Sequence, residues 1–337
     1  MKLLIFLMVG PWAWASINLS CPEAFLIENR VNEASRLPPR VKLDLFELFP
    51  MEHIDAMHLG AFTDIGVSSQ FAPITSDTML FAYRNGWKLY HHFDVEGTMP
   101  EWQMPAYRGI HNFARTRELA RTSSAFKQTK KLFFNKKGEP QYDVRINYEQ
   151  ERIVRYVASA EHSAQDTMSK TFLTGENGRQ FRWNRTWLSP EIQGAFIELI
   201  SRGHGYTIGV YTNANHPFHE PDAPNGKLVG AAFGIEAGGG FTSISTGMDR
   251  TPIEPGGNKL RYDGAGKIAD FTEIDYIQSL GRDWLDSVTV NALPRAFGAY
   301  FITRAEHHEL LRRARENPVR ILSPSGSYRI NFDAWLK

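Results

Sequence analysis

The sequence LVGAAFGIEAGGGFTSISTGM, which runs from residue 228 to residue 248, decides the fold of this chain. Apolar and small residues alternate on both sides of three consecutive glycines at 238–240. Alternation with a period of two is typical of strands, and a tight turn between strands needs residues that adopt positive φ, as glycine does. The stretch therefore predicts a β-hairpin over residues 228–248.

A helix and a third strand are predicted to follow the hairpin. Residues 264–290 read GAGKIADFTEIDYIQSLGRDWLDSVTV. Apolar side chains recur there at helical spacing, and Gly281 is placed to end the helix. Residues 284–290 are then expected to form a strand. The apolar stripe of the helix consists of Ile268, Phe271, Ile274 and Ile277.

This order of strand, strand, helix and strand resembles the core of the acetyl-CoA-dependent N-acetyltransferase superfamily. One branch, the leucyl/phenylalanyl-tRNA-protein transferases, carries a TWI helix start, an LVGGLYG strand, a GGxFFGESMF strand, an ASK-led helix, LIDCQ and SLGAxxIPR. The corresponding segments here are, in the same order, TWLSPE, LVGAAFG, GGGFTSISTGM, AGK, WLDSV and RAFGAYFITR. The resemblance implies an α+β fold: an N-acyltransferase-like mixed sheet flanked by helices, with a smaller N-terminal α+β domain.

The resemblance places the chemistry on Asp286. In the family, an aspartate and a glutamine two residues apart accept the proton of the attacking α-amine, and the glutamate of GESMF helps to hold the substrates. Asp286 keeps the acid, but the glutamine position is Val288 and the glutamate position is Ile244. Neither side chain accepts a proton or orients an amine, so the departures affect the chemistry rather than the scaffold. In the alternative interpretation, Asp286 belongs only to a buried hydrogen-bond network.

Asp286 is expected to lie buried at the floor of a cleft between the strands at 241–248 and 284–290. Because Val288 and Ile244 flank it with apolar surface, desolvation should raise the pKa of the Asp286 carboxyl unless backbone N–H groups or a hydroxyl compensate. A partly protonated acid would suit general acid–base chemistry, whereas a fully hydrogen-bonded one would suit a structural role.

Five residues are candidates for the substrate pocket. Trp102 and Trp187 fall on positions where the family uses tryptophans to stack on the aminoacyl-adenosine end, and core packing is the alternative role for both. Phe241, Ser243 and Ser245 alternate along the second hairpin strand and are predicted to share one face, which lines the pocket in the family. Ser243 replaces a glycine and is expected to narrow the pocket.

Arg261, Gly264 and Gly266 form an R-x-x-G-x-G pattern directly before the predicted helix. Acetyl-CoA-dependent transferases present backbone N–H groups and a helix dipole to pyrophosphate with this pattern. CoA binding is therefore one hypothesis, and a flexible glycine-rich loop is the other. The family reaction itself implies no cofactor.

The loop that reads NHPFHEPD at 215–222 contains His216, His219, Glu220 and Asp222. Its prolines argue against a helix that would place both histidines on one face, so a surface loop is favoured over a metal site. We expect no metal.

The net charge is balanced overall but not locally. The 337 residues contain 38 Lys or Arg and 37 Asp or Glu, which gives a formal charge of +1 and no global nucleic-acid footprint. Residues 111–155 contain eleven Lys or Arg against five acids, a net charge of +6. This basic segment is either a solvated helical surface or a binding surface for an anionic partner.

The N-terminus predicts export. MKLLIFLMVGPWAWA has a lysine, an apolar run and a small-x-small site, so a signal peptide at 1–15 with cleavage after Ala15 is expected. The run is too short for a transmembrane segment, which needs roughly 20 apolar residues. Cys21 is the only cysteine and is expected to be a free thiol rather than a lipid anchor. Cytoplasmic localisation is the alternative if no cleavage occurs.

Two domains are expected. Residues 16–40 form an irregular lead-in, 41–160 the N-terminal domain, 161–185 an inserted loop, 186–316 the acyltransferase-like domain and 317–337 a C-terminal extension. One helix is predicted to begin after a cap at Ser76 or Asp77, and another, at 190–200, after a cap at Ser189. Further helices are predicted at 41–49, 123–134, 148–160 and 305–316. Strands are predicted at 142–146, 206–212 and 328–332.

Three functions compete. By resemblance, the chain transfers Leu or Phe from an aminoacyl-tRNA to the N-terminal amine of an acceptor protein. An exported protein meets no charged tRNA, however, so the second hypothesis keeps acyl transfer and changes the donor, for example to an acyl-CoA. In the third, the chain is a non-catalytic exported binding protein that uses the old pocket.

Overall fold

The computed structural model describes residues 67–69, 74–93, 98–104, 107–159, 172–174, 180–182, 187–223, 225–254, 259–288, 292–316 and 325–336. The predicted signal peptide, the lead-in and the helix at 41–49 lie outside these residues, as does most of the inserted loop at 161–185.

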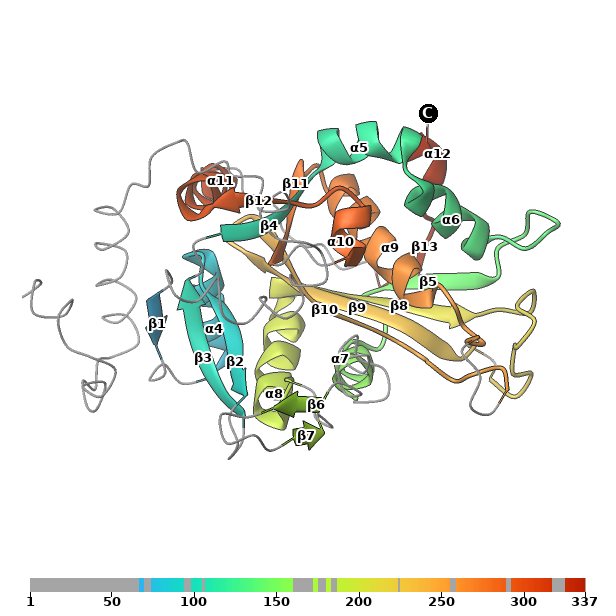
Figure 1. The fold of residues 1–337 in the computed structure, drawn as a ribbon, viewed down its shortest axis with the longest axis horizontal. Coiled ribbons are helices and arrows are strands. Elements are labelled where there is room, and N and C mark those ends of the chain that lie inside the picture. Colours follow the sequence, from blue (N-terminus) through green and yellow to red (C-terminus); the bar gives the residue numbers. More distant parts are fainter. Residues whose placement is uncertain are drawn as a thin grey trace, which may run out of the picture.

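A mixed sheet of eight strands with helices on both faces forms the centre of the molecule, which confirms the predicted fold class (Figure 1). The strand order is β12-β4-β11-β10-β9-β8-β5-β13. Only β10 and β11 are parallel, because helix α9 crosses between them; the other neighbouring pairs in this sheet are antiparallel. The strands are β4 (Tyr107–Asn112), β5 (Tyr142–Ile146), β8 (Gly205–Thr212), β9 (Leu228–Ala237), β10 (Gly240–Met248), β11 (Trp284–Val288), β12 (Tyr300–Thr303) and β13 (Gly326–Tyr328).

The predicted hairpin is confirmed as β9 and β10. Gly238 and Gly239 adopt φ values of 67° and 85° in the turn, a conformation that other residues rarely take. All ten residues of β9 are buried, because this strand lies inside the sheet with helices over both of its faces. The predicted helix and third strand follow as α9 (Ala265–Ser279) and β11, and Gly281 ends the helix region with φ 82°.

Two buried clusters fill the space on either side of the sheet. One contains side chains of α5, α6, α9 and α12, and the other contains side chains of α4, α7 and α8. Figure 1 shows the ribbons of α5, α6 and α9 on one side of the sheet and those of α7 and α8 on the other. A smaller cluster lies under α11 and includes Ile110, Trp284 and Leu311. The helices are α4 (Ser76–Arg84), α5 (Phe113–Thr122), α6 (Ser124–Phe133), α7 (Gln150–Ala158), α8 (Pro190–Leu199) with the π-turn η2 (Ile200–His204), α9, α10 (Ala292–Ala296), α11 (Arg304–Glu316) and α12 (Phe332–Leu336).

Two smaller sheets complete the described structure. A three-stranded sheet has the order β1 (Val67–Ser69), β3 (Thr98–Met104) and β2 (Lys88–Phe93), and β6 (Phe172–Thr174) pairs with β7 (Gln180–Arg182). The predicted two-domain division stays a prediction, and strands from both sides of the 161–185 segment share the large sheet. Among the described helices, none is long and apolar enough to cross a membrane.

Helix starts depend on single capping residues, and one of these was predicted wrongly. Ser189 caps α8 as expected, since its side chain accepts a hydrogen bond from the Ile192 amide. Helix α4 is capped by Thr75, which accepts from the Thr78 amide at 3.1 Å, rather than by Ser76 or Asp77. Asp77 lies inside the first turn instead, where it pairs with Arg202 at 2.7 Å.

The C-terminal extension packs back onto α9 through one acid. Asp275 accepts hydrogen bonds from the Trp335 indole at 2.7 Å, the Tyr328 hydroxyl at 2.9 Å and the Asn331 amide at 3.1 Å. The predicted strand at 328–332 is therefore wrong beyond its first residue. Strand β13 ends at Tyr328, and the chain turns so that Asn331 accepts a hydrogen bond from the Ala334 amide at the start of α12.

Candidate active site

Asp286 lies where β10 and β11 run side by side in parallel. Its Cα pairs with that of Thr242 across the two strands, and only 1% of Asp286 is exposed. Its burial and its place beside the second hairpin strand are as predicted, β4 is a neighbour that was not predicted, and the cleft stays a prediction. A charge at such a depth needs polar partners, because an isolated buried carboxylate is strongly destabilising.

Three side chains from three different elements surround the Asp286 carboxylate. Arg108 of β4 donates to Oδ2 from both Nε, at 3.1 Å, and Nη2. His307 of α11 places Nε2 at 3.2 Å from the same oxygen, and Thr242 of β10 places its hydroxyl at 3.5 Å. Arg108 and His307 are each 1% exposed, so the ion pair is removed from solvent.

These partners reverse the expected titration behaviour of Asp286. Burial by itself raises the pKa of the carboxyl, but the Arg108 guanidinium and the adjacent His307 imidazole outweigh it and hold the pKa well below its usual range. From the sequence, the pKa of Asp286 was expected to be raised unless backbone N–H groups or a hydroxyl compensated for burial. The compensation comes mainly from a guanidinium and an imidazole, so Asp286 is a carboxylate at neutral pH.

The polar partners of Asp286 do not come from position 288, where the family has its glutamine. The Val288 backbone pairs with Gly109 after a register shift in β11, and the new partners come from β4 and α11. No role was predicted for Arg108 from the sequence. His307 was missed, and the signal was a histidine in line with Leu311 and Ala314 on the buried stripe of α11.

Lys88 and Tyr83 are buried titratable residues that sense the charges of this ion pair. Lys88 is 7% exposed, and burial together with the Arg108 charge lowers the pKa of its amine to about 7. Burial raises the pKa of Tyr83, whose hydroxyl lies 3.5 Å from the Leu89 amide. Both groups sense the charges of Arg108 and Asp286, so the site is an electrostatically coupled cluster.

The two candidate tryptophans lie on different elements. Trp102 is in β3, where its backbone pairs with Leu89 and Ser69. Trp187 precedes α8 and packs edge-on against Phe196, with ring centroids 6.4 Å apart. This contact is what the packing alternative predicts for Trp187, and the stacking role of both tryptophans stays a prediction.

A β-bulge separates the candidate residues of β10 and contradicts the prediction that they share one face. The register shifts between Ser243, which pairs with Gly234, and Ser245, which pairs with Phe233. Because Phe233 packs on Phe196 of α8, Ser245 faces the side of α8. Ser243 faces the other side, where it hydrogen-bonds Glu273 of α9.

The α9 side of this bulge contains two acids that the sequence did not single out, the buried Glu273 and the partly buried Asp270. Glu273 accepts a hydrogen bond from the Tyr206 hydroxyl at 2.6 Å, and Asp270, one turn earlier, accepts one from Thr246. Burial raises the pKa of Glu273 to about 8 and that of Asp270 to about 7. The signal in the sequence was two acids, three residues apart, next to the apolar stripe of the predicted helix.

The raised pKa of Glu273 predicts a fall in stability with increasing pH. The folded chain holds a proton on Glu273 that the unfolded chain releases above about pH 4.3, so the free energy of unfolding should decrease between about pH 4 and pH 8. Glu273→Gln imitates the protonated acid and should reduce this decrease by about 1–3 kcal/mol. Urea unfolding at pH 5, 7 and 8.5 measures it, with the exposed Glu118→Gln as control. An unchanged slope in Glu273→Gln would contradict the assignment.

The R-x-x-G-x-G segment adopts the predicted position at the start of α9. Gly264 has φ 89° and lies against Leu132, where an added Cβ would come within 2.5 Å of that side chain. Gly266 packs on Met248, and Arg261 is exposed with its guanidinium near the Phe218 ring. Close packing therefore accounts for both glycines, and CoA binding stays a prediction.

The NHPFHEPD loop is anchored by aromatic packing. His216 is buried, its Nε2 lies 3.0 Å from the Tyr142 hydroxyl, and its ring stacks on Tyr262. Burial lowers the pKa of His216 to about 4. In the described part of the chain, no group of three or more His, Cys, Asp or Glu residues is arranged to hold a metal ion.

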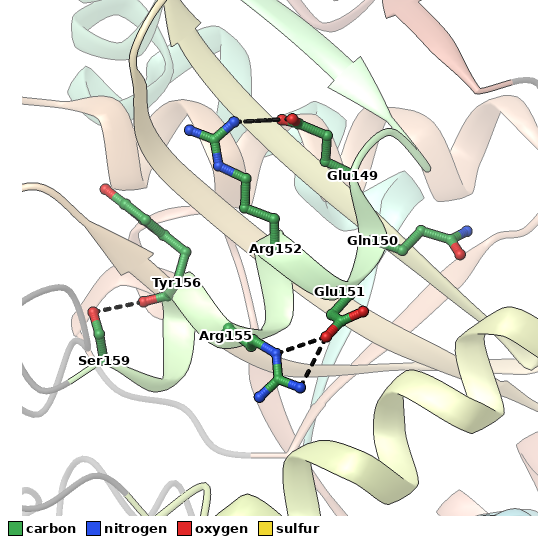
Figure 2. A pocket seen from close by; sticks show the side chains of 7 residues that line it. All are labelled: Glu149, Gln150, Glu151, Arg152, Arg155, Tyr156 and Ser159. Carbon is green, nitrogen blue, oxygen red and sulfur yellow. Dashed lines mark hydrogen bonds and ion pairs between the residues drawn. The ribbon is translucent and has the colours of Figure 1, made fainter.

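The basic segment divides into two parts. At α7, a surface pocket is lined by Glu149, Gln150, Glu151, Arg152, Arg155, Tyr156 and Ser159. Figure 2 shows that Arg152 and Arg155 pair there with Glu149 and Glu151, at 2.8 Å in each case. Acids of the same helix thus neutralise the cations of this pocket.

The second part, on α5 and α6 and in the turn after them, keeps its positive character. Exposed cations far outnumber the exposed acids Glu118 and Glu139 on this surface. Arg115 lies over the Tyr300 ring at 4.6 Å and Arg117 over the Trp335 ring at 5.8 Å, which restricts both side chains. The exposed cations are Arg115, Arg117, Arg121, Lys127, Lys131, Lys136 and Lys137.

Comparison with known proteins identifies the relatives of this chain. No family model matches it. A leucyl/phenylalanyl-tRNA–protein transferase of Ruegeria pomeroyi is 27% identical over 129 residues, which cover 38% of this chain and 50% of that protein. The transferase of the same name from Vibrio campbellii is 25% identical over 198 residues, 58% of this chain and 64% of that protein. The chain is a distant relative of these transferases.

The relationship covers part of each protein. The chain spans about half the length of the curated relatives that it matches, including the transferase of Neisseria meningitidis at 26% identity. A solved structure, the C-terminal domain of a putative lysylphosphatidylglycerol synthetase from Agrobacterium fabrum, aligns with 82% of this chain and 78% of that one at 8% identity. Its TM-score of 0.31 is too low to bear on fold or function.

Proposed function

We propose that this distant relative of the Leu/Phe transferases is an amine-acylating transferase, with Leu or Phe on a tRNA as donor and a protein N-terminal amine as acceptor. The observation that carries the proposal is the position of Asp286. It is a buried carboxylate at the parallel junction of β10 and β11, at the position that the sequence resemblance assigns to the family's aspartate. Val288 and Ile244 stand where the family has its glutamine and glutamate, so the transfer assays must identify the donor and the acceptor.

The charge state of Asp286 defines what it contributes. When an amine attacks an ester carbonyl, positive charge develops on the nitrogen as the C–N bond forms. A preorganised carboxylate in a site shielded from water stabilises such a charge. With a pKa held far below 7 by Arg108 and His307, Asp286 is a poor proton acceptor and a good electrostatic partner.

The exposed cations of α5 and α6 support a nucleic-acid donor. Lys and Arg side chains that neutralise phosphates bind nucleic acid in a salt-dependent manner. A tRNA whose acceptor end reaches Asp286 would place its backbone phosphates on such a surface. Charge reversal at Lys127 and Lys131 is the direct test, because loss of phosphate contacts should weaken tRNA binding and reduce its salt dependence.

Transfer assays with Asp286→Asn test the function. Purified protein is mixed with Leu-tRNA or Phe-tRNA and a peptide with either a free or an acetylated N-terminus. We expect transfer to the free amine only, and a loss of roughly 100-fold or more in Asp286→Asn. The exposed Asp263→Asn serves as the matched control and should be fully active, and thermal melts confirm that both variants fold.

Two results would overturn the proposal. Wild-type protein that acylates no peptide amine, but still binds an aminoacyl-adenosine analogue, would be a binding protein. Transfer that is indifferent to Asp286→Asn would place the chemistry elsewhere.

The N-terminus decides the donor. We expect mass spectrometry of the natural protein to find either an intact chain in the cytoplasm or a chain that begins at Ser16 after removal of 1–15. The first result is compatible with a tRNA donor. The second, in an extracytoplasmic fraction, would exclude tRNA and leave an acyl donor such as a CoA thioester.

A further inference from the structure

His307 is the one buried imidazole in the described chain that lies on the Asp286 carboxylate. Its side chain is 2% exposed, and the edge of its ring packs against Trp284, with ring centroids 6.2 Å apart. Asp286 is in turn fixed by Arg108 from the neighbouring strand. The Arg108 guanidinium of β4, the Asp286 carboxylate of β11 and the His307 imidazole of α11 thus form one chain of contacts.

We infer that His307 is the proton acceptor of the acyl-transfer site, oriented by Asp286, and that it supplies the function for which Val288 has no suitable group. The inference rests on the proposed function and adds a residue to it.

The geometry selects one tautomer of His307. Nε2 lies 3.2 Å from Oδ2 of the ionised Asp286, and the negative charge favours the tautomer that carries its proton on this nitrogen. In the neutral ring, Nδ1 then holds the free lone pair. This nitrogen lies near the turn after α4, since a Cβ added to Gly86 would be 3.6 Å from it.

The surroundings keep the imidazole neutral. Burial lowers the pKa of His307, the nearby negative charge of Asp286 acts in the opposite direction, and the charge of Arg108 lowers the pKa again. On α11 itself, His308 senses the charges of His307 and Arg304, and Glu306 precedes His307 in the chain. Lys88 of β2 and Tyr83 of α4 also sense the charges of Arg108 and Asp286. An acceptor that is neutral at pH 7 and backed by a carboxylate meets the requirement for general base catalysis.

The proposed step conserves atoms and charge. The amine nitrogen attacks the ester carbonyl, a C–N bond forms, and the nitrogen gives one proton to His307 Nδ1. The C–O bond to the ribose then breaks, and the imidazolium returns the proton to the departing oxygen. Asp286 stays ionised throughout and stabilises the imidazolium, as a carboxylate does beside a catalytic histidine.

Single-turnover transfer at pH 5 to 8.5 tests the inference. His307→Gln keeps a hydrogen-bond donor for Asp286 but cannot act as a base. We expect a 100- to 10,000-fold lower rate at saturating donor, with little change in KM. The wild-type rate should rise through an acid limb below about pH 6.5, the ordinary histidine value, and the variant should lose that limb.

His308→Gln is the matched control, because His308 is the adjacent histidine on the same helix and its pKa is lowered to about 4. It should keep the wild-type rate and pH profile. Lys88→Met should keep the acid limb as well. If the limb disappears in Lys88→Met and persists in His307→Gln, the lysine is the base and the inference is wrong.

A second measurement uses the wild-type protein and does not depend on how variants fold. In 15N-histidine-labelled protein at pH 7, the His307 signals should show a protonated Nε2 and an unprotonated Nδ1. The opposite tautomer or an imidazolium would overturn the inference. If wild-type protein transfers nothing, the proposed function fails; if it transfers and His307→Gln does so equally well, only the role of His307 fails.

Discussion

Replacement of Arg108 by methionine is expected to destabilise the protein by about 3–5 kcal/mol at pH 7, because it leaves the Asp286 carboxylate buried without its main counter-charge. Arg108 and Asp286 are each 1% exposed, so solvent cannot compensate for the loss. Urea unfolding of wild-type and Arg108→Met protein measures the difference.

The pH dependence of the stability of Arg108→Met distinguishes loss of the counter-charge from loss of packing. In wild-type protein the depressed pKa of Asp286 contributes stability that is present above about pH 4 and is lost as the pH falls through the folded-state value. Without Arg108, burial favours the protonated acid, so the deficit of Arg108→Met should shrink as the pH is lowered from 7 to 5. A deficit that is constant over this range would indicate a packing effect.

A double-mutant cycle supplies the control. Arg108→Met combined with Asp286→Leu removes both charges, and replacing a buried pair by apolar side chains is often close to neutral. The double variant should therefore be more stable than Arg108→Met alone. If the two single losses simply add, the pair contributes no coupling and the expected result is wrong.

Replacement of Trp335 by alanine should have an effect of similar size, about 3–5 kcal/mol. Trp335 is 1% exposed and lies among Phe113, Phe126 and Phe271, so the C-terminal helix closes a core that the earlier part of the chain builds. The variant also deprives Asp275 of its shortest hydrogen bond, at 2.7 Å. Thermal and urea unfolding measure the loss.

Two variants divide the Trp335 effect into parts. Trp335→Phe keeps an aromatic ring and removes the indole donor, and should cost about 1–3 kcal/mol as a lost hydrogen bond to a buried group. Phe81→Ala removes a ring that is 37% exposed and should cost far less than Trp335→Ala. A Trp335→Ala variant as stable as Phe81→Ala would show that the extension is dispensable for the core.

Of the buried ionic cluster at the candidate site, only Asp286 was predictable from the sequence. Asp286 stood out as a lone acid on a strand with apolar neighbours, and the ordered motifs assigned it to the family's catalytic position. Arg108 and His307 are 178 residues before and 21 residues after it in the sequence. No local pattern links positions that distant, so their convergence on one carboxylate oxygen had to come from strand pairing and from the docking of α11.

The errors have local causes that sequence periodicity does not contain. One extra residue at the β10 bulge placed Ser243 and Ser245 on opposite faces, because a bulge interrupts the two-residue alternation. The strand expected at 328–332 became a turn and a helix because Asp275 of α9 binds the Asn331 amide. In both places a tertiary contact or register selected among conformations that the local sequence allowed.

By itself, the sequence determined the hairpin, the crossover helix and the third strand, since glycine turns and apolar periodicity are local properties of the chain. It thereby determined the fold class and the relationship to the Leu/Phe transferases. Only the tertiary structure decided that Asp286 is ionised, because the pKa of a buried acid depends on which charges lie within a few ångströms of it. That choice depends on residues from β4, β10 and α11, which meet only when the sheet is complete.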